Sequence, residues 1–442
     1  MITSNAFKGK RYGVFGLART GISVAAALAA SGAEVVGWDD GEAPRADAVV
    51  DLLDPERWFD IPMDAVIVSP GIARDRHPLT LRADALHVPV IGDIELFALA
   101  RAGLPQHRVV GITGTNGKST TTALVHHILV QAGVPATMGG NIGLPILGQE
   151  PLTTNGVYVL ELSSYQVDLT FSLVSDVAVL LNITPDHLDR HHTIEDYAAA
   201  KARLFGMQIP QDTAVIALDD RLCRDIANTA VGHLVPVSAD RVLDEGVSVV
   251  AGIARIDDIP IGLQSDWPDL QGPHNAQNAA AAIATARALG LTIDAIQAGL
   301  ASYKGLPHRM ERVAEVGGVT YVNDSKATNA ASTAPALAAY ESVHWIAGGI
   351  AKTEELDACL PVLGHVRAAY LIGTAAPMFE HILGGLIPVV MAGTLANAVA
   401  LAHAAAKPGE VVLLSPACAS FDQFKDYAAR GAAFRSAVEA LA

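Results

Sequence analysis

The chain has 442 residues, of which 51% are hydrophobic and 17% are charged. A chain this long and this apolar buries sizeable cores, which excludes global disorder. Its 46 acidic residues outnumber its 30 lysines and arginines and give a formal net charge of −16, which argues against nucleic acids and anionic membranes as partners.

Short apolar runs alternate with alanine-rich stretches from end to end, which indicates an α/β protein with mainly parallel sheets. We expect three domains: a Rossmann-like domain at residues 1–97, a central P-loop domain at 98–305 and a Rossmann-like C-terminal domain at 306–442. The first has predicted strands at 11–16, 34–38 and 65–68 and a helix at 23–30. The second has predicted strands at 107–112, 156–160, 176–181 and 213–217 and helices at 120–132 and 275–289. The third has predicted strands at 319–322, 344–347, 369–372 and 411–414.

The cysteines and the N-terminal residues indicate the cellular compartment in which we expect the protein. Three scattered cysteines with no C-x-x-C spacing argue against a disulfide framework and a thiolate zinc site. The first ten residues lack the apolar core of a signal peptide, and no apolar run reaches the ~18 residues that span a bilayer. We therefore expect a soluble, cytoplasmic protein.

A glycine loop follows the strand at 107–112 and reads Gly111-Ile-Thr-Gly-Thr-Asn-Gly-Lys-Ser-Thr-Thr121. Glycines let backbone N–H groups fold around phosphates, and the N-terminus of the following helix adds positive charge. Lys118 is expected to reach the outer phosphates of a nucleotide, and Ser119 to bind Mg²⁺. The spacing departs from G-x-x-x-x-G-K-[ST], because Gly111 comes one residue too early. The alternative is an ordinary strand–helix turn.

The first domain has another glycine turn, Gly13-Val-Phe-Gly16, without the G-x-G-x-x-G spacing of a dehydrogenase. Taken alone, it fits a plain tight turn as well as a diphosphate site. Asp39 directly follows the next predicted strand, at 34–38. It is either a hydrogen-bond acceptor for a ribose or base, or a solvated turn acid.

An acid, a histidine and a lysine follow strands or lie on a helix in the second domain. Glu161 directly follows the strand at 156–160 and suits Mg²⁺, which prefers carboxylate oxygens. His187 follows another strand, but histidine is an unusual ligand for this metal. Lys201 lies on a helix that begins near Thr193. Taken alone, it is better interpreted as a solvated helix residue.

Polar turns also follow three strands of the third domain. They contain the run 323–329, Lys352 and the serine-rich run 415–424. Because ligands of parallel sheets sit beyond the carboxyl ends of strands, these turns suit a small anion such as an amino acid carboxylate. The alternative is a set of ordinary polar turns.

Several motifs occur in order along the chain: Thr113-Gly-Thr-Asn-Gly-Lys-Ser-Thr120, Gly140-Asn141-Ile-Gly143, Glu161-Leu-Ser-Ser164, Asp186-His-Leu-Asp189, His274-Asn275, Gly305-Leu-Pro-His-Arg309, Asn323-Asp-Ser-Lys-Ala-Thr-Asn329 and Ser415-Pro-Ala-Cys-Ala-Ser-Phe-Asp-Gln-Phe424. This series closely resembles the Mur ligases over essentially the whole length of the chain. The last two motifs are the specific ones, whereas the glycine loop is shared with folylpolyglutamate synthases.

The resemblance implies an ATP-dependent ligase that acts through an acyl phosphate. It implies ATP, Mg²⁺, UDP-N-acetylmuramoyl-L-alanine and D-glutamate as ligands, and a monomer. It also implies roles for individual residues. Those implied for ATP are Gly114, Thr115, Asn116, Gly117, Lys118, Ser119, Thr120, Asn275, Arg309 and Asp324. Those implied for the metal are Ser119, Glu161, His187 and a carbamylated Lys201. Those implied for the UDP-sugar are Arg19, Thr20, Asp39, Ser69, Gly71, Asn141 and Ser163. Those implied for D-glutamate are Lys326, Thr328, Lys352, Ser420 and Phe421. The residues implied in catalysis are Lys118, His187, Lys201 and Arg309.

Three alternatives are weighed against this interpretation. A ligase of the same family that uses another amino acid, such as L-glutamate, stays open. A folylpolyglutamate synthase is disfavoured, because about one hundred residues of α/β pattern precede the glycine loop. A non-catalytic nucleotide-binding protein would be expected to lack one of four residues, yet all are present: Lys118, Glu161, His187 and Lys201.

Overall fold

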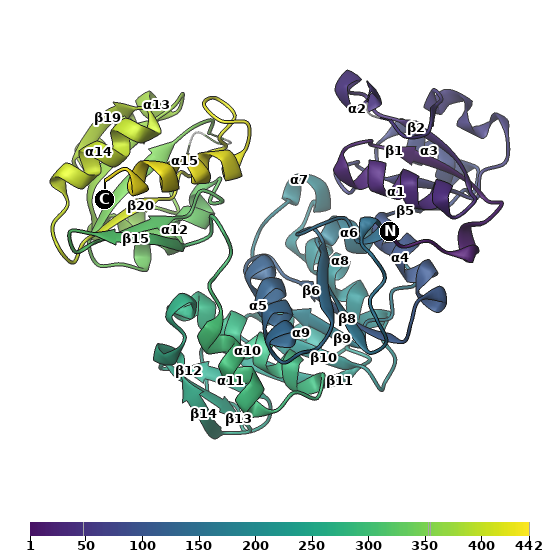
Figure 1. Cartoon of the computed structure of the whole chain (residues 1–442), viewed down its shortest axis with the longest axis horizontal. Coiled ribbons are helices and arrows are strands. Elements are labelled where there is room, and N and C mark those ends of the chain that lie inside the picture. The colour runs from purple at the N-terminus through teal and green to yellow at the C-terminus, as the bar shows by residue number, and fades with distance from the viewer. Residues whose placement is uncertain (47, 352, 354, 442) are drawn as a thin grey trace. The chain divides into compact units, whose positions relative to one another are not determined.

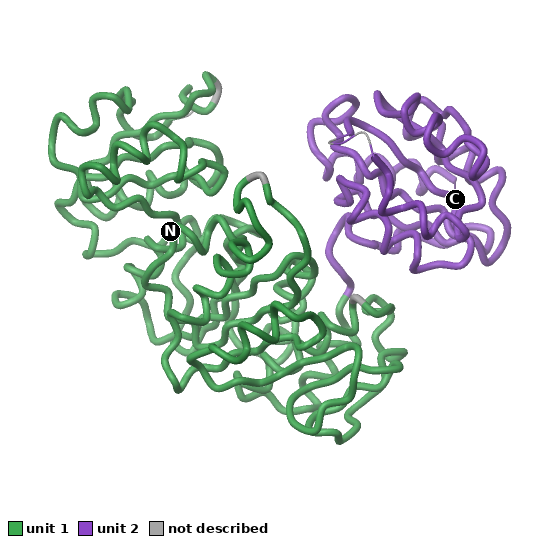
Figure 2. The backbone as a smooth tube through the Cα atoms, turned by 180° about the vertical axis from the view of Figure 1, so that it is seen from behind, with its two compact units in different colours: residues 1–303 green, residues 304–442 purple. Residues whose placement is uncertain are grey.

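The computed structural model describes residues 1–46, 48–351, 353 and 355–441, and these form two compact units, residues 1–303 and 304–442 (Figure 2). Both are α/β, as predicted (Figure 1). The unit boundary lies beside the Gly-Leu-Pro run at 305–307. The predicted boundary at residue 97 lies within the first unit and stays a prediction.

The first sheet is parallel, with the strand order β3-β2-β1-β4-β5. Its strands are β1 (Arg11–Phe15), β2 (Glu34–Trp38), β3 (Asp51–Leu52), β4 (Ala65–Val68) and β5 (Val90–Ile91). Its helices are α1 (Arg19–Ala30), α2 (Glu42–Ala46), α3 (Pro78–Ala85) and α4 (Asp93–Ala100). The order reverses between β1 and β4, which is where such sheets bind ligands. Helix α1 begins four residues before its predicted start at 23, so Arg19 and Thr20 lie in its first turn.

Gly21 allows α1 to start close against the glycine turn. A Cβ built at Gly21 lies 1.7 Å from the carbonyl oxygen of Gly16. We therefore expect Gly21→Ala to lower the free energy of unfolding by roughly 1–3 kcal/mol, the range for overpacked sites. Urea denaturation followed by circular dichroism measures this change. Gly206→Ala is the control, because a Cβ at Gly206 has nothing within 4 Å. Equal stability of the two variants would contradict the prediction.

The central sheet has the strand order β14-β13-β12-β11-β10-β9-β6-β8-β7. Its strands are β6 (His107–Thr113), β7 (Ala136–Gly140), β8 (Gly156–Glu161), β9 (Val177–Leu180), β10 (Thr213–Ala217), β11 (His233–Ser238), β12 (Val247–Val250), β13 (Ile253–Ile256) and β14 (Ile259–Leu263). Its helices are α5 (Lys118–Gln131), α6 (Ser164–Asp168), α7 (Leu188–His191), α8 (Ile194–Gly206), α9 (Arg221–Ala227), α10 (Pro273–Ala288) and α11 (Ile293–Ser302).

The antiparallel end of this sheet, β12 to β14, was not predicted. Strands β13 and β14 are only partly buried, so they lack the continuous apolar runs that mark β8 and β9. Among the described residues, none forms a helix with the length and apolar character that crossing a bilayer requires.

The second unit contains a sheet with the order β15-β16-β20-β17-β18-β19, parallel except for β15. Its strands are β15 (Glu311–Val316), β16 (Val319–Asn323), β17 (Val343–Gly348), β18 (Val366–Ile372), β19 (Val389–Gly393) and β20 (Val411–Leu414). Its helices are α12 (Ala330–Ala338), α13 (Ala376–Leu383), α14 (Leu395–Ala405) and α15 (Tyr427–Glu439). Strands β16, β20 and β17 are neighbours, so the three polar turns picked out from the sequence follow adjacent strands.

Candidate active site

The glycine loop, Gly114 to Gly117, joins the central strand β6 to helix α5. Gly117 has a φ of 81°, in the left-handed region, and a Cβ there would lie 2.2 Å from Oδ1 of Asn278. Conformation and space therefore both require glycine at this position. The predicted helix start at 120 moves to Lys118, so Lys118, Ser119 and Thr120 form the first helical turn. This places the positive end of the helix beside the loop, as anion binding needs.

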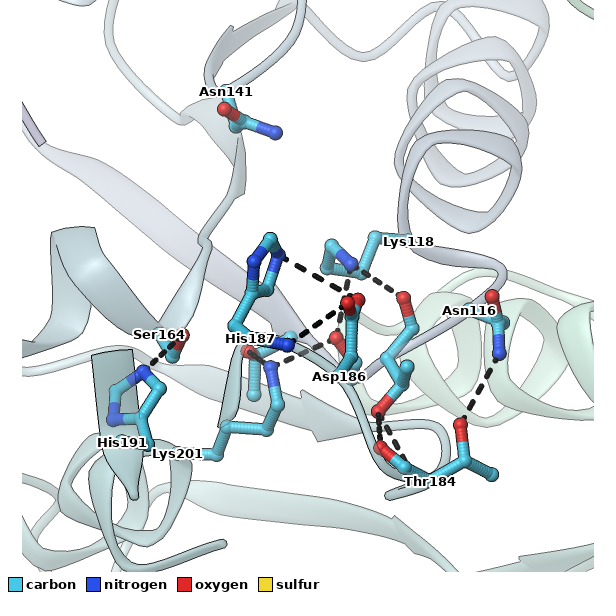
Figure 3. Close-up of polar contacts among 12 residues, drawn as sticks. Asn116, Lys118, Asn141, Ser164, Thr184, Asp186, His187, His191 and Lys201 are labelled. Atoms are coloured by element: carbon cyan, nitrogen blue, oxygen red, sulfur yellow. Dashed lines mark hydrogen bonds and ion pairs between the residues drawn. The ribbon is translucent and has the colours of Figure 1, made fainter. Parts of the chain in front are cut away.

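The ammonium group of Lys118 lies over the loop. Its Nζ donates hydrogen bonds to the carbonyl oxygens of Gly114, at 2.9 Å, and Thr115, at 2.7 Å (Figure 3). The side chain of Ser119 in the next position is buried. A lysine cation at the helix start and a hydroxyl beside it are the groups expected for nucleotide phosphates and their metal ion.

A segment after β9 that the sequence analysis did not single out shapes the loop. Oδ1 of Asn182 accepts a hydrogen bond from the backbone N–H of Asn116 at 2.8 Å, and its carbonyl accepts one from Thr115 at 2.8 Å. The backbone N–H of Thr184 donates to Oγ1 of Thr115 at 3.0 Å. The position of these residues, directly after a predicted strand, was the signal that could have found them.

Asn275 connects to the glycine loop through Asn278, which was also not predicted. Oδ1 of Asn275 accepts from the amide of Asn278 at 3.1 Å, and Oδ1 of Asn278 accepts from the hydroxyl of Thr121 at 3.2 Å. Helix α10 is thereby tied to the first turns of α5.

Glu161 is the last residue of β8 and is 2% exposed. Its Oε1 accepts a hydrogen bond from the amide of Asn141 at 3.0 Å. Within the part of the chain that the structure describes, its buried Oε2 has no hydrogen-bond partner. A buried carboxylate oxygen without a hydrogen-bond donor is suited to bind a cation, as the predicted Mg²⁺ role requires.

Lys201 lies on α8, whose N-cap is Thr193 as predicted. It is fully buried, so the alternative of a solvated helix lysine is wrong. Its Nζ donates to the carbonyl oxygen of Gly114 at 2.8 Å and lies 4.3 Å from the ring centre of Tyr197. Burial, and secondarily the charge of Lys118, hold the pKa of Lys201 well below its usual range.

His187 is the N-cap residue of the short helix α7 and has a φ of 54°. Its Nε2 lies 3.5 Å from a carboxylate oxygen of Asp186, and both side chains face Lys118 and Lys201 in Figure 3. No three His, Cys, Asp or Glu side chains of the described residues form a metal cluster. Besides Glu161 and His187, a Mg²⁺ ion here would therefore need further oxygen ligands, such as the hydroxyl of Ser119 and the oxygens of a nucleotide.

A cavity of about 350 Å³ lies where the first sheet reverses its order. Its lining includes Arg19, Thr20, Gly71 and Asn141, four residues predicted to face the UDP-sugar, and two that were not predicted, Asp93 and Gln166. The other three residues predicted for this ligand, Asp39, Ser69 and Ser163, are not among its lining residues. The carboxylate of Asp39 accepts from the N–H groups of Leu17, at 2.7 Å, and Gly41, at 2.8 Å. Asp39 is therefore bound within its turn rather than merely solvated.

Two serines predicted for the same ligand make local contacts. The hydroxyl of Ser69 donates to the carbonyl oxygen of Gly16 at 3.4 Å. Ser163 caps helix α6 in a capping box with Gln166.

The second unit contains the remaining predicted residues. Asp324, directly after β16, accepts hydrogen bonds from the hydroxyl of Ser415 at 2.8 Å and the N–H of Met310 at 3.2 Å. Burial raises the pKa of Asp324 to about 7. Arg309 lies in the turn before β15, where its N–H donates to the carbonyl oxygen of Leu306 at 3.2 Å.

The residues predicted for D-glutamate lie in the turns after β16 and β20. Nζ of Lys326 lies 4.0 Å from the ring centre of Tyr427, and Thr328 follows in the same turn. Ser420 is buried, and its hydroxyl has no partner among the residues described. Phe421 is 70% exposed. Lys352 lies outside the described residues.

Arg430 of α15, which the sequence analysis missed, braces these turns. It is 1% exposed, and its guanidinium donates to the carbonyl oxygens of Ser325, at 2.8 Å, and Cys418, at 3.0 Å, and more weakly to that of Gly348 at 3.5 Å. One buried side chain therefore holds the ends of β16, β17 and β20 in a fixed relation.

Two protein-family models match the chain. The description of the first is "Mur ligase middle domain", and it matches residues 112–286. The description of the second is "Mur ligase, glutamate ligase domain", and it matches residues 308–418.

Curated relatives and solved structures extend the similarity to the whole chain. The chain is 56% identical to a UDP-N-acetylmuramoylalanine--D-glutamate ligase of Novosphingobium aromaticivorans, covering 100% of this chain and 97% of that protein. It is also 56% identical to the ligase of the same name from Sphingopyxis alaskensis, covering 100% of both. Two solved structures share its fold: the UDP-N-acetylmuramate-alanine ligase MurC of Thermotoga maritima (TM-score 0.62, 18% identity, 98% of this chain and 99% of that one) and the MurF ligase of the same organism with ADP (TM-score 0.62, 19% identity, 100% of both).

Proposed function

The chain belongs to the Mur ligases, and we propose that it joins D-glutamate to UDP-N-acetylmuramoyl-L-alanine at the expense of ATP. The observation that carries this proposal is the full-length similarity to ligases of that name. The reaction belongs to the synthesis of peptidoglycan precursors. We further propose that the protein is a cytoplasmic monomer, and its net charge of −16 argues against a nucleic-acid partner.

The proposed reaction has two steps, a phosphoryl transfer and an acyl transfer. A carboxylate oxygen of the L-alanine end attacks the γ-phosphorus of ATP, and ADP leaves with the electrons of the broken P–O bond. The free amine of D-glutamate then attacks the acyl carbon, loses a proton and expels phosphate. Phosphate is a far better leaving group than the original carboxylate oxygen, which is why the acid must first be activated.

The residues assigned to ATP suit the first step. The loop from Gly114 to Thr120 would cradle the phosphates, with Asn275 at the adenine and Asp324 at the ribose. The ammonium of Lys118 and the guanidinium of Arg309 would balance the charge that gathers on the transferred phosphoryl group. The present contacts of Lys118 are with carbonyl oxygens, which phosphate oxygens can replace.

Mg²⁺ would be held by Ser119 and by Glu161, His187 and a carbamylated Lys201. When bound, it supplies charge neutralisation at the phosphates. The buried, unpartnered oxygen of Glu161 supports this assignment. The low pKa of Lys201 supports the modification, because only the neutral amine adds to CO₂.

The other two ligands have separate sites. Arg19, Thr20, Asp39, Ser69, Gly71, Asn141 and Ser163 are assigned to the UDP-sugar. Lys326, Thr328, Lys352, Ser420 and Phe421 are assigned to D-glutamate, whose two carboxylates need cations.

Phosphate release with ATP, Mg²⁺ and UDP-N-acetylmuramoyl-L-alanine across a panel of amino acids tests the function. We expect turnover that depends on D-glutamate and at least about 100-fold lower kcat/KM with L-glutamate, since the inverted centre misplaces the amine or a carboxylate. Omitting the UDP-sugar is the control and should abolish phosphate release. Preference for L-glutamate or another amino acid would favour the alternative ligase, and absence of turnover would overturn the proposal.

A further inference from the structure

Asp93 is a buried acid that the assignments above leave without a role. It is the first residue of α4 and is 4% exposed. It lines the 350 Å³ cavity together with Arg19 and Asn141. Among the residues that the structure describes, its Oδ1 has no hydrogen-bond partner. A buried carboxylate oxygen without a donor costs free energy, unless a ligand in the cavity provides one.

We propose that Asp93 recognises the sugar of the UDP-linked substrate, with its Oδ1 accepting a hydrogen bond from a hydroxyl or amide N–H of the N-acetylmuramoyl group. This inference rests on the proposed function. It assigns a specificity-determining residue to one part of the substrate and leaves the diphosphate to other groups.

The two parts of the UDP-sugar differ in charge: the diphosphate is anionic, whereas the sugar is neutral where it carries hydroxyl and amide groups. Arg19 and the N-terminus of α1 offer positive charge to a diphosphate. An ionised Asp93 would repel the same diphosphate. Burial raises the pKa of Asp93 to about 6, so the group is still a carboxylate, and a pure acceptor, at pH 8. The partner of Asp93 must therefore be a neutral donor, and the sugar supplies donors of this kind.

The residues that line the cavity agree with a sugar bound beside Asp93. Asn141 lines the cavity, and its amide donates to Glu161, the proposed metal ligand. A substrate whose diphosphate lies at Arg19 and whose carboxylate reaches Glu161 has its sugar between them. Gln166 also lines the cavity, and its Oε1 accepts hydrogen bonds from the backbone N–H of Ser163 at 3.1 Å and from its hydroxyl at 3.2 Å, so its side chain is held in place.

Calorimetric titration at pH 8 with two ligands, UDP-N-acetylmuramoyl-L-alanine and UDP, tests the proposal without turnover. We expect Asp93→Ala to raise the Kd of the UDP-sugar about 10- to 100-fold and to change the Kd of UDP less than about twofold. Asp93→Asn keeps the shape and a neutral acceptor, so its loss should be smaller and again confined to the UDP-sugar. Glu95→Gln is the matched control. Glu95 is a buried acid of the same helix, but its oxygens already accept from Phe171 and Ser172, so it should not separate the two ligands.

Two results would overturn the inference. Equal weakening of UDP and UDP-sugar would mean that Asp93 supports the fold or the diphosphate. Unchanged affinities in both Asp93 variants would mean that it contacts neither. Failure of the unaltered chain to bind the UDP-sugar is a different result, since it overturns the proposed function itself.

Discussion

Lys118→Ala is expected to abolish turnover, with a loss of at least about 10³-fold in kcat/KM for ATP. The ammonium is the cation placed at the start of α5 beside the glycine loop, and its hydrogen bonds to Gly114 and Thr115 hold it there. Alanine removes the charge that would stabilise the transferred phosphoryl group. Steady-state kinetics with ATP as the varied substrate measures the effect.

The control for this variant is Lys10→Ala, which removes an exposed lysine of the same unit. It should keep normal kinetics, and both variants should keep the thermal unfolding midpoint within a few degrees. Activity of Lys118→Ala within about tenfold of the unaltered chain would exclude the proposed role of Lys118 at the phosphates.

Lys201→Ala is expected to be inactive, by about 10²- to 10³-fold, and to regain part of its activity when a small carboxylate is added. The proposed modification explains both effects. The neutral amine of Lys201 forms an N–C bond with CO₂ and releases one proton, which turns a buried amine into a carboxylate-like ligand. Formate or acetate entering the space left by the side chain would supply similar oxygens.

Lys201→Arg is the matched control, because arginine keeps a cation at the site but cannot form the carbamate or leave room for formate. It should be inactive and not rescued. Carbon-13 NMR of the unaltered chain under ¹³CO₂ should show a carbamate resonance that Lys201→Arg lacks. Full activity of Lys201→Ala, or equal response of both variants to formate, would refute the carbamate.

The sequence predicted most of the central strands of the parallel sheets, because buried parallel strands are continuous apolar runs, but it missed β3, β5, β7, β11 and β19. The strands at 34–38, 65–68, 213–217 and 411–414 are confirmed residue for residue. The hairpin strands β13 and β14 were not predicted, since these partly exposed strands contain no continuous apolar run. The glycine-loop residues were likewise predictable from the sequence, whereas the starts of the three helices predicted with bounds were placed two to four residues late.

The part of the site that could not be predicted consists of groups whose importance depends on burial. Lys201 carries no mark in the sequence that separates it from a solvated helix lysine, yet it is fully buried. Asp93 and Arg430 likewise become notable through what surrounds them. Whether a charged side chain is enclosed is decided by the packing of segments far apart in the chain, which no local pattern encodes.

Asn182 already fixes both Thr115 and Asn116 before any nucleotide arrives. A loose loop would lose about 1–2 kcal/mol of backbone conformational entropy per residue when it closed around phosphates. Here the loop loses that entropy when the chain folds, so binding a nucleotide does not have to overcome it. Because Asn182 follows β9, nucleotide affinity then depends partly on how stably β9 is packed in its sheet. Substitutions in the core beneath β9 would then weaken ATP binding without reaching the nucleotide, and would do so more steeply as temperature rises.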